Sequence, residues 1–155
     1  MSRGGGTAAR ALVAAGLLTG VAARESEAQQ AREIGLQGVV VAESPAFLAG
    51  GVFAGLRTTR RMRLAAIASV GSADANAAWR GELLGHFLLN PGSRQAPGVY
   101  VGGGVAVAGP AERGYVVILV GLEGTPGGRS GWALEAGLGG GFRATAGWRW
   151  RSFSR

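Results

Sequence analysis

The chain has 155 residues, enough for one domain, and it contains no cysteine, which excludes a disulfide scaffold, a cysteine-ligated metal site and a lipid-modified cysteine. Its 30 glycines lie among valine, leucine and alanine without a collagen-like repeat, so the composition disfavours long helices and disorder. The net charge of +7 comes from 16 bases, all arginine, which are spread singly apart from one group near residue 60. We therefore expect no nucleic-acid partner.

The first 28 residues indicate a cleaved secretory signal peptide. Arg3 and Arg10 give it a basic start, and residues 11–23 form an apolar run of thirteen. That run is shorter than the ~20 residues of a membrane-spanning helix. Small residues place the cleavage site between positions 23 and 30, after Ala28 in preference to Ala23. The alternative is an uncleaved amphipathic helix. Export would carry the rest of the chain out of the cytoplasm.

From position 32 onward, apolar residues recur with a period of two, and turn signals interrupt the pattern about every dozen residues. This periodicity predicts strands, because successive side chains of a strand point to opposite faces. Each run is close to the 9 to 11 residues with which a tilted strand crosses a bilayer. The eight predicted strands cover residues 33–43, 46–58, 61–71, 79–89, 98–108, 113–124, 130–139 and 142–153.

Two of these runs show the alternation most clearly. In 79–89 one face is apolar or glycine, whereas the other carries Arg80, Glu82 and His86. In 142–153, FRATAGWRWRSF, one face is aromatic and apolar and the other carries three arginines. A soluble sheet also alternates, so the setting depends on what encloses each face.

Across the eight runs, charged residues collect on one face and almost none occur on the other. A barrel of eight strands is just wide enough for side chains to fill its interior, and buried charges are tolerated there when they are paired. The sequence therefore predicts an all-β fold: one eight-stranded, antiparallel, up-and-down transmembrane barrel over residues 32–153, with a polar, salt-bridged lumen. The thirteen predicted lumen residues are Glu33, Glu43, Arg57, Arg61, Arg63, Arg80, Glu82, His86, Glu123, Glu135, Arg143, Arg149 and Arg151.

The signal peptide, the eight alternating runs and the aromatic final strand together resemble the OmpA-like group of small bacterial outer-membrane β-barrels. The resemblance implies a location in the bacterial outer membrane, lipid and the secretion and barrel-assembly machinery as partners, and a monomeric state. It also implies a terminal aromatic residue that the assembly machinery reads, which would be Phe153 or Trp150. All connections between the runs are short, which disfavours an adhesive or receptor-binding role.

Within the predicted lumen, we single out a charge network that either seals the barrel or gates a narrow pore. It consists of Arg80, Glu82, His86, Glu123, Glu135, Arg143 and Arg149. The sealed barrel is the favoured alternative. His86 is the only histidine, so a multi-histidine metal site is excluded, and it lacks the His-x-Ser pair that the resemblance to barrel deacylases would require. We predict that His86 pairs with Glu82 or another acid, and we predict no enzymatic activity and no cofactor.

Aromatic residues near the ends of the runs favour the membrane setting, because such residues gather at bilayer interfaces. The predicted interface residues are Trp79, Trp132, Trp148, Trp150 and Phe153. The alternative is a secreted or periplasmic soluble barrel that binds an apolar ligand, as lipocalins do. In that protein the two faces would be exchanged, with valine and leucine inside and arginine in water.

Overall fold

The computed structural model describes residues 31–153. The predicted signal peptide and its cleavage site lie outside these residues. Within them, no helix is long and apolar enough to cross a membrane.

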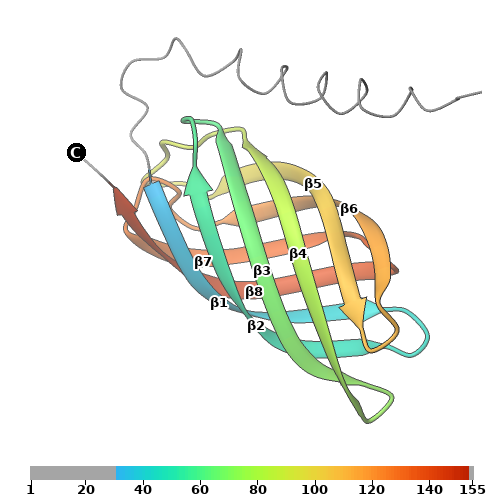
Figure 1. Ribbon diagram of the computed structural model, residues 1–155. Helices are drawn as coiled ribbons and strands as arrows, with labels where there is room; N and C mark the ends of the chain where they lie inside the picture. Colours follow the sequence, from blue (N-terminus) through green and yellow to red (C-terminus); the bar gives the residue numbers. More distant parts are fainter. Residues whose placement is uncertain (1–30, 154–155) are drawn as a thin grey trace, which may run out of the picture.

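The described chain forms eight strands in a single layer, drawn from blue to red in Figure 1. They follow one another as β1 (Ala31–Ala42), β2 (Phe47–Arg57), β3 (Met62–Ala73), β4 (Asn76–Leu88), β5 (Gly98–Gly109), β6 (Arg113–Glu123), β7 (Ser130–Leu138) and β8 (Phe142–Phe153).

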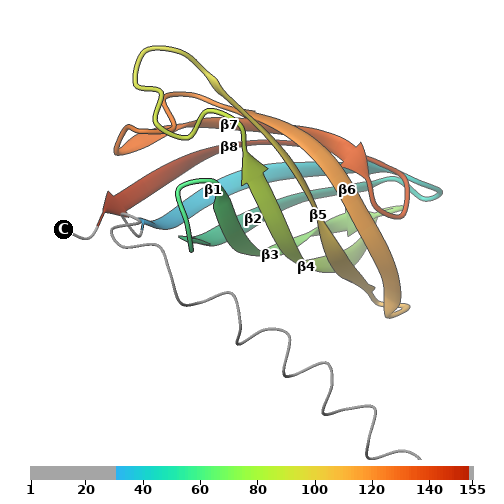
Figure 2. The same ribbon diagram turned by 90° about the horizontal axis from the view of Figure 1, so that it is seen from above.

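Each strand pairs antiparallel with its neighbours in sequence, and the sheet closes on itself. The closing pair is β1 with β8, in register from Ala31 opposite Phe153 to Ala42 opposite Phe142. Figure 2 shows the tilted strands from above. Closure satisfies the backbone groups of both end strands, so the barrel has no free edge along this seam. The predicted fold class is confirmed.

Side chains alternate between a buried interior and an exposed exterior along the strands, most regularly in β1. Leu83, Val101, Ile118 and Leu134 point outward with 64%, 46%, 65% and 47% of their surface exposed. Arg80, Glu82 and Glu135 of the same strands are buried inside, and so are His86 and Glu123. Arg113, the first residue of β6, is exposed. The soluble alternative placed the apolar residues in the interior, and on this point it is wrong.

The β3–β4 connection differs from the sequence-based expectation. The predicted strands 61–71 and 79–89 leave the polar segment 72–77 in a connection, but β3 and β4 continue into it and only Asp74 and Ala75 remain as the turn. Both have positive φ angles, 50° and 61°, as the tightest β-hairpins require. The Asn76 side-chain amide donates to the Asp74 carbonyl at 2.9 Å. Local hydrogen bonding therefore allows a two-residue turn without glycine.

The two ends of the barrel differ in the length of their connections. We call the end where β1 begins and β8 ends the terminal end. It carries the two longest connections, 89–97 and 124–129, together with 58–61, whereas the opposite end carries the short connections 43–46, 74–75, 110–112 and 139–141.

Two predicted lumen residues lie in these connections. Arg61 is exposed in the β2–β3 turn, so its predicted place in the lumen is wrong. The reason is that β3 begins only at Met62, and side-chain alternation places a residue inside the barrel only within a strand. Glu43 follows β1 and is half-buried at the opposite end, where it accepts a 3.4 Å hydrogen bond from the Tyr115 hydroxyl.

Candidate functional site

The candidate site is the charge network that fills the barrel. Among residues 31–153, six buried arginines face four buried glutamates, a formal excess of two positive charges. All seven residues of the predicted network are buried. Their structural or gating role remains a prediction. The ten buried charged residues are Glu33, Arg57, Arg63, Arg80, Glu82, Glu123, Glu135, Arg143, Arg149 and Arg151.

The first cluster surrounds Glu82 and Glu135. Arg143 joins them, because its Nη2 donates to Glu82 at 2.7 Å and its Nη1 to Glu135 at 2.9 Å. Arg80 donates from Nε to Glu82 at 2.6 Å, and Arg149 from Nη2 to Glu135 at 2.6 Å. The two carboxylates are thus held by three guanidinium groups from β4 and β8. Charge-assisted bonds of this kind are the strong class of protein hydrogen bonds.

The second cluster lies nearer the terminal end and surrounds Glu33 and Glu123. Arg63 bridges them from β3, with Nη1 at 3.2 Å from Glu33 and 2.8 Å from Glu123. Arg57 also bridges them from β2, with Nε at 2.6 Å from Glu33 and Nη2 at 3.3 Å from Glu123. Arg151 on β8 donates to Glu123 at 3.0 Å. These contacts tie together five strands, β1, β2, β3, β6 and β8, which are not all neighbours, across the lumen.

Arg149 and two aromatic rings connect the clusters. The guanidinium of Arg149 lies 3.7 Å from Glu123, and its Cζ is 4.1 Å from the centroid of Phe53. Arg63 covers Tyr100, with Cζ 4.6 Å from the ring centroid. The Tyr100 hydroxyl donates to Glu135 at 2.8 Å. Gly121 makes room for this ring, because a Cβ at that position would overlap it. Cation–π contacts therefore fill the space between the ion pairs.

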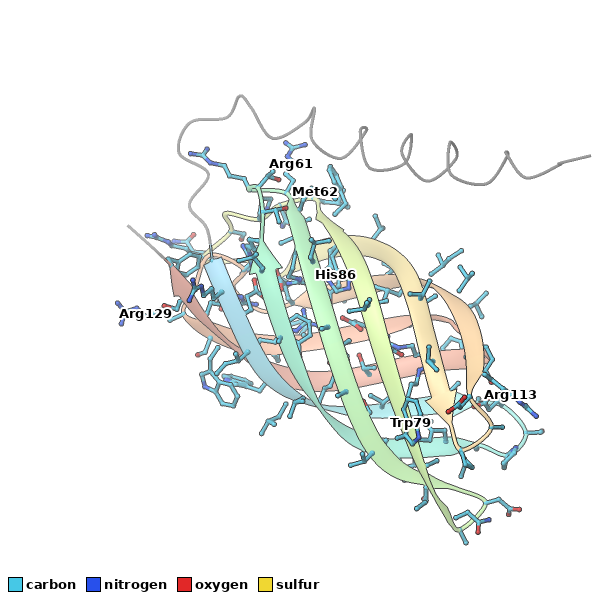
Figure 3. All side chains as sticks on the ribbon, in the orientation of Figure 1. Arg61, Met62, Trp79, His86, Arg113 and Arg129 are labelled. Carbon is cyan, nitrogen blue, oxygen red and sulfur yellow. The ribbon has the colours of Figure 1, made fainter. Side chains whose placement is uncertain are left out.

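His86 lies between the clusters, and its partner is not the one we predicted. Nε of Arg63 donates to Nδ1 of His86 at 3.0 Å, so this ring nitrogen is an acceptor and carries no proton. The prediction that His86 pairs with Glu82 or another acid is wrong. Arg63 reaches the ring because the two residues are directly opposite in the β3–β4 register. Figure 3 shows His86 inside the barrel.

This arrangement can hold strands together, and its side chains fill the interior of the barrel. Arg63, His86 and Arg143 have 0% of their surface exposed, so these side chains are out of contact with water. Among residues 31–153, no group of three histidine, cysteine or acidic residues could hold a metal ion. Four of the buried arginines also keep a guanidinium nitrogen without a hydrogen-bond partner, as expected where donors outnumber acceptors: Arg63, Arg80, Arg149 and Arg151.

The predicted interface aromatics lie at both ends of the outer surface. Trp132, Trp148 and Trp150 are near the terminal end, where Trp132 and Trp148 are opposite each other in the β7–β8 register. Trp79 is near the opposite end, as Figure 3 shows. The four tryptophan residues are 36% to 45% exposed. Phe153 differs from them, because it is half-buried at the terminal mouth with inward parity.

No family model matches the chain, and no curated protein matches it in sequence. Among solved structures, it is similar to the N-terminal β-barrel domain of OprF from Pseudomonas aeruginosa. The TM-score is 0.63 at 18% sequence identity, and the match covers 81% of this chain and 100% of that domain. The chain has the fold of the OprF barrel domain.

In this OprF-like barrel, the predicted charge network left out several residues that belong to the site. Glu33, Arg57, Arg63 and Arg151 were expected in the lumen but not among the site residues, although they form the entire second cluster with Glu123. Tyr100, which donates to Glu135, was not among the predicted site residues either. The signal that could have identified them is register: once hairpins are aligned, inward charges on neighbouring strands fall at the same level.

Proposed function

We propose that this protein is an outer-membrane β-barrel with a structural role, whose lumen is closed by its internal ion pairs and which performs no catalysis. The OprF-like fold supports the architecture, and the physical chemistry of the two faces supports the location.

The observation that carries the proposal is the reversal of the usual burial pattern. Ten charged side chains are buried, whereas large apolar side chains such as Ile34, Val70 and Val116 are 63%, 71% and 73% exposed. Monomeric soluble proteins rarely expose contiguous apolar patches above a few hundred Å². In lipid the same surface is favourable, and a closed barrel leaves no backbone group unpaired in hydrocarbon.

The aromatic residues support this setting. Tryptophan favours the boundary between hydrocarbon and headgroups, and here exposed tryptophans occur toward each end of the outer surface with aliphatic residues between them. Strands of 9 to 13 residues are long enough to cross the ~30 Å hydrocarbon core at a tilt. The proposal includes export by the predicted signal peptide, insertion by the barrel-assembly machinery and a monomeric state.

Fractionation of expressing bacteria tests the location. We expect the protein in the outer-membrane fraction, extractable only with detergent. Because a closed barrel stays compact until heated, we also expect the unheated protein to migrate faster than the boiled protein on a detergent gel. A periplasmic protein of known location is the control. Recovery in the soluble fraction without detergent would rule out the membrane location.

A conductance measurement tests whether the lumen is closed. In planar bilayers we expect no channel activity from the wild type, because its central side chains are inaccessible to water. Arg149→Ala should open brief, small conductances, since it removes the side chain that joins the two clusters. Arg113→Ala, at an exposed position on β6, is the matched control and should remain silent. Steady conductance in the wild type would contradict the closed lumen.

A further inference from the structure

A cavity of about 260 Å³ lies at the mouth of the barrel on the terminal end. Three connections surround it, the β2–β3 turn, the β4–β5 loop and the β6–β7 loop. The polar side chains of its lining are all arginines, and no acidic residue lines it. The lining residues are Arg57, Arg60, Pro91, Gly92, Arg94, Gly127 and Phe153.

Arg57 is the buried member of this lining, with only 4% of its surface exposed. Its Nε is held by Glu33 at 2.6 Å and its Nη2 by Glu123 at 3.3 Å. The remaining nitrogen, Nη1, has a long 3.5 Å contact with the carbonyl of Pro91, which also lines the cavity. Arg57 is thus fixed by the ion pairs below it, while its third nitrogen remains a poorly satisfied donor on the loop side.

The loops around the cavity are tied to each other and to themselves. The amide of Gly127 donates to the carbonyl of Ser93 at 2.9 Å, which joins the β6–β7 and β4–β5 loops. Within the β4–β5 loop, the Asn90 side chain accepts from Val99 at 2.8 Å and donates to Pro97 at 3.0 Å. The Ser93 hydroxyl donates to the Ala96 carbonyl at 2.8 Å. These bonds pre-organise the cavity, which reduces the entropy lost when a ligand binds.

The distribution of charge between the two ends of the barrel makes the surroundings of the cavity positive. The exposed Arg32, Arg61 and Arg129 surround the terminal end, where no exposed acid occurs among residues 31–153. The exposed acids of that range, Asp74 and Glu112, are in turns at the opposite end. Figure 3 shows Arg61 and Arg129 at one end and Arg113 at the other. A concave site surrounded by one sign of charge concentrates counter-ions of the other sign.

We propose that this mouth cavity binds an oxyanion of the phosphate class. Arg60 and Arg94 would hold it from opposite loops and Arg57 from below. Guanidinium groups suit this ligand because their planar donors match phosphate oxygens in pairs. Without an anion, like charges face one another across the cavity, and binding relieves that repulsion. The site does not depend on where the barrel resides, so it goes beyond the proposed location and closed lumen.

Calorimetric titration with inorganic pyrophosphate at low ionic strength tests the site. The full chain is folded in a glucoside detergent, which contains no phosphate, and folding is verified by gel mobility before and after heating. We expect saturable binding of the wild type, and affinity about ten-fold weaker in the double variant R60Q/R94Q, since two charge-assisted contacts are lost. Both residues are exposed, so the substitutions leave the buried clusters unchanged. R113Q removes the same charge from the opposite end and should bind as the wild type does.

A second arm of the experiment identifies the source of the phosphate group. Mixed micelles containing short-chain phosphatidylglycerol compete with pyrophosphate if a lipid headgroup reaches the cavity, and they have no effect if it accepts only soluble anions. Either result supports the site when R60Q/R94Q weakens the binding. No saturable binding by a correctly folded wild type, or equal binding by the wild type and R60Q/R94Q, would overturn the proposal. Neither of those results bears on the membrane location, which the fractionation tests separately.

Discussion

Replacing Glu123 with glutamine should lower the free energy of unfolding by about 3 to 5 kcal/mol. Glu123 is 1% exposed and contacts Arg57, Arg63 and Arg151 at 3.3 Å, 2.8 Å and 3.0 Å. The substitution preserves the size of the side chain but removes its charge. The lumen already has an excess of positive charge, so the three guanidinium groups would then share only Glu33. Arg63 among them has 0% of its surface exposed, so water does not screen its charge.

Urea-induced unfolding of the barrel in lipid vesicles, followed by tryptophan fluorescence, measures this effect. The matched control is Glu112→Gln, the same change at an exposed position in the β5–β6 turn, which should alter stability by no more than about 0.5 kcal/mol. If both variants showed the same small loss of stability, the ion pairs at the terminal end would contribute no more to the free energy of unfolding than surface pairs do. The proposed closure of the lumen would then depend on packing alone.

The architecture could be predicted because one property, the side-chain period of two, determines both the strands and their faces. In 79–89 the alternation of Arg80, Glu82 and His86 with apolar residues assigns every residue to one side, and the structure agrees. Charge is the more informative half of the pattern. Leucine tolerates several environments, whereas an arginine costs ~2 to 4 kcal/mol in the middle of a bilayer and therefore restricts which face can meet lipid.

Periodicity is less informative where strands end. Arg61 has the parity of a lumen residue, but parity has meaning only within a strand, and the β2–β3 turn includes this residue. The segment 72–77 looked like a loop because it is polar, although its composition is equally compatible with strand ends outside a bilayer. Such boundaries depend on turn geometry, here the positive φ angles of Asp74 and Ala75, which alternation does not encode.

Which residues of the site contact one another was harder to predict than which residues point into the lumen. The inward face of each strand follows from its own sequence, whereas a contact across the lumen depends on tilt and register of strands far apart in the chain. Arg57 meets Glu123 over a separation of 66 residues, and Arg143 meets Glu82 over 61. His86 shows the consequence, because an acid was the reasonable partner by charge and the register placed Arg63 beside it instead.

The second large effect is expected from a charge placed on the outer surface of the barrel. Ile118 lies at the middle of β6 and is 65% exposed, so Ile118→Arg should lower the free energy of unfolding in lipid vesicles by about 2 to 4 kcal/mol. The physical reason is that a charge at this depth must leave water or deform the bilayer. The same change in water would be nearly neutral, because an exposed surface position of a soluble barrel accepts arginine.

Gly114→Arg is the control on the same strand and the same outward face. It lies next to the first residue of β6, and a side chain there would meet no neighbouring atom within 4 Å. The cost should fall to about 0 to 1 kcal/mol, because a long side chain near the interface extends its charge into the headgroups. We expect depth in the bilayer to be the main source of the difference between the two positions. If both substitutions had the same small effect in vesicles, the apolar surface would not face lipid, and the exposed leucines, valines and isoleucines would require a protein partner in place of a membrane.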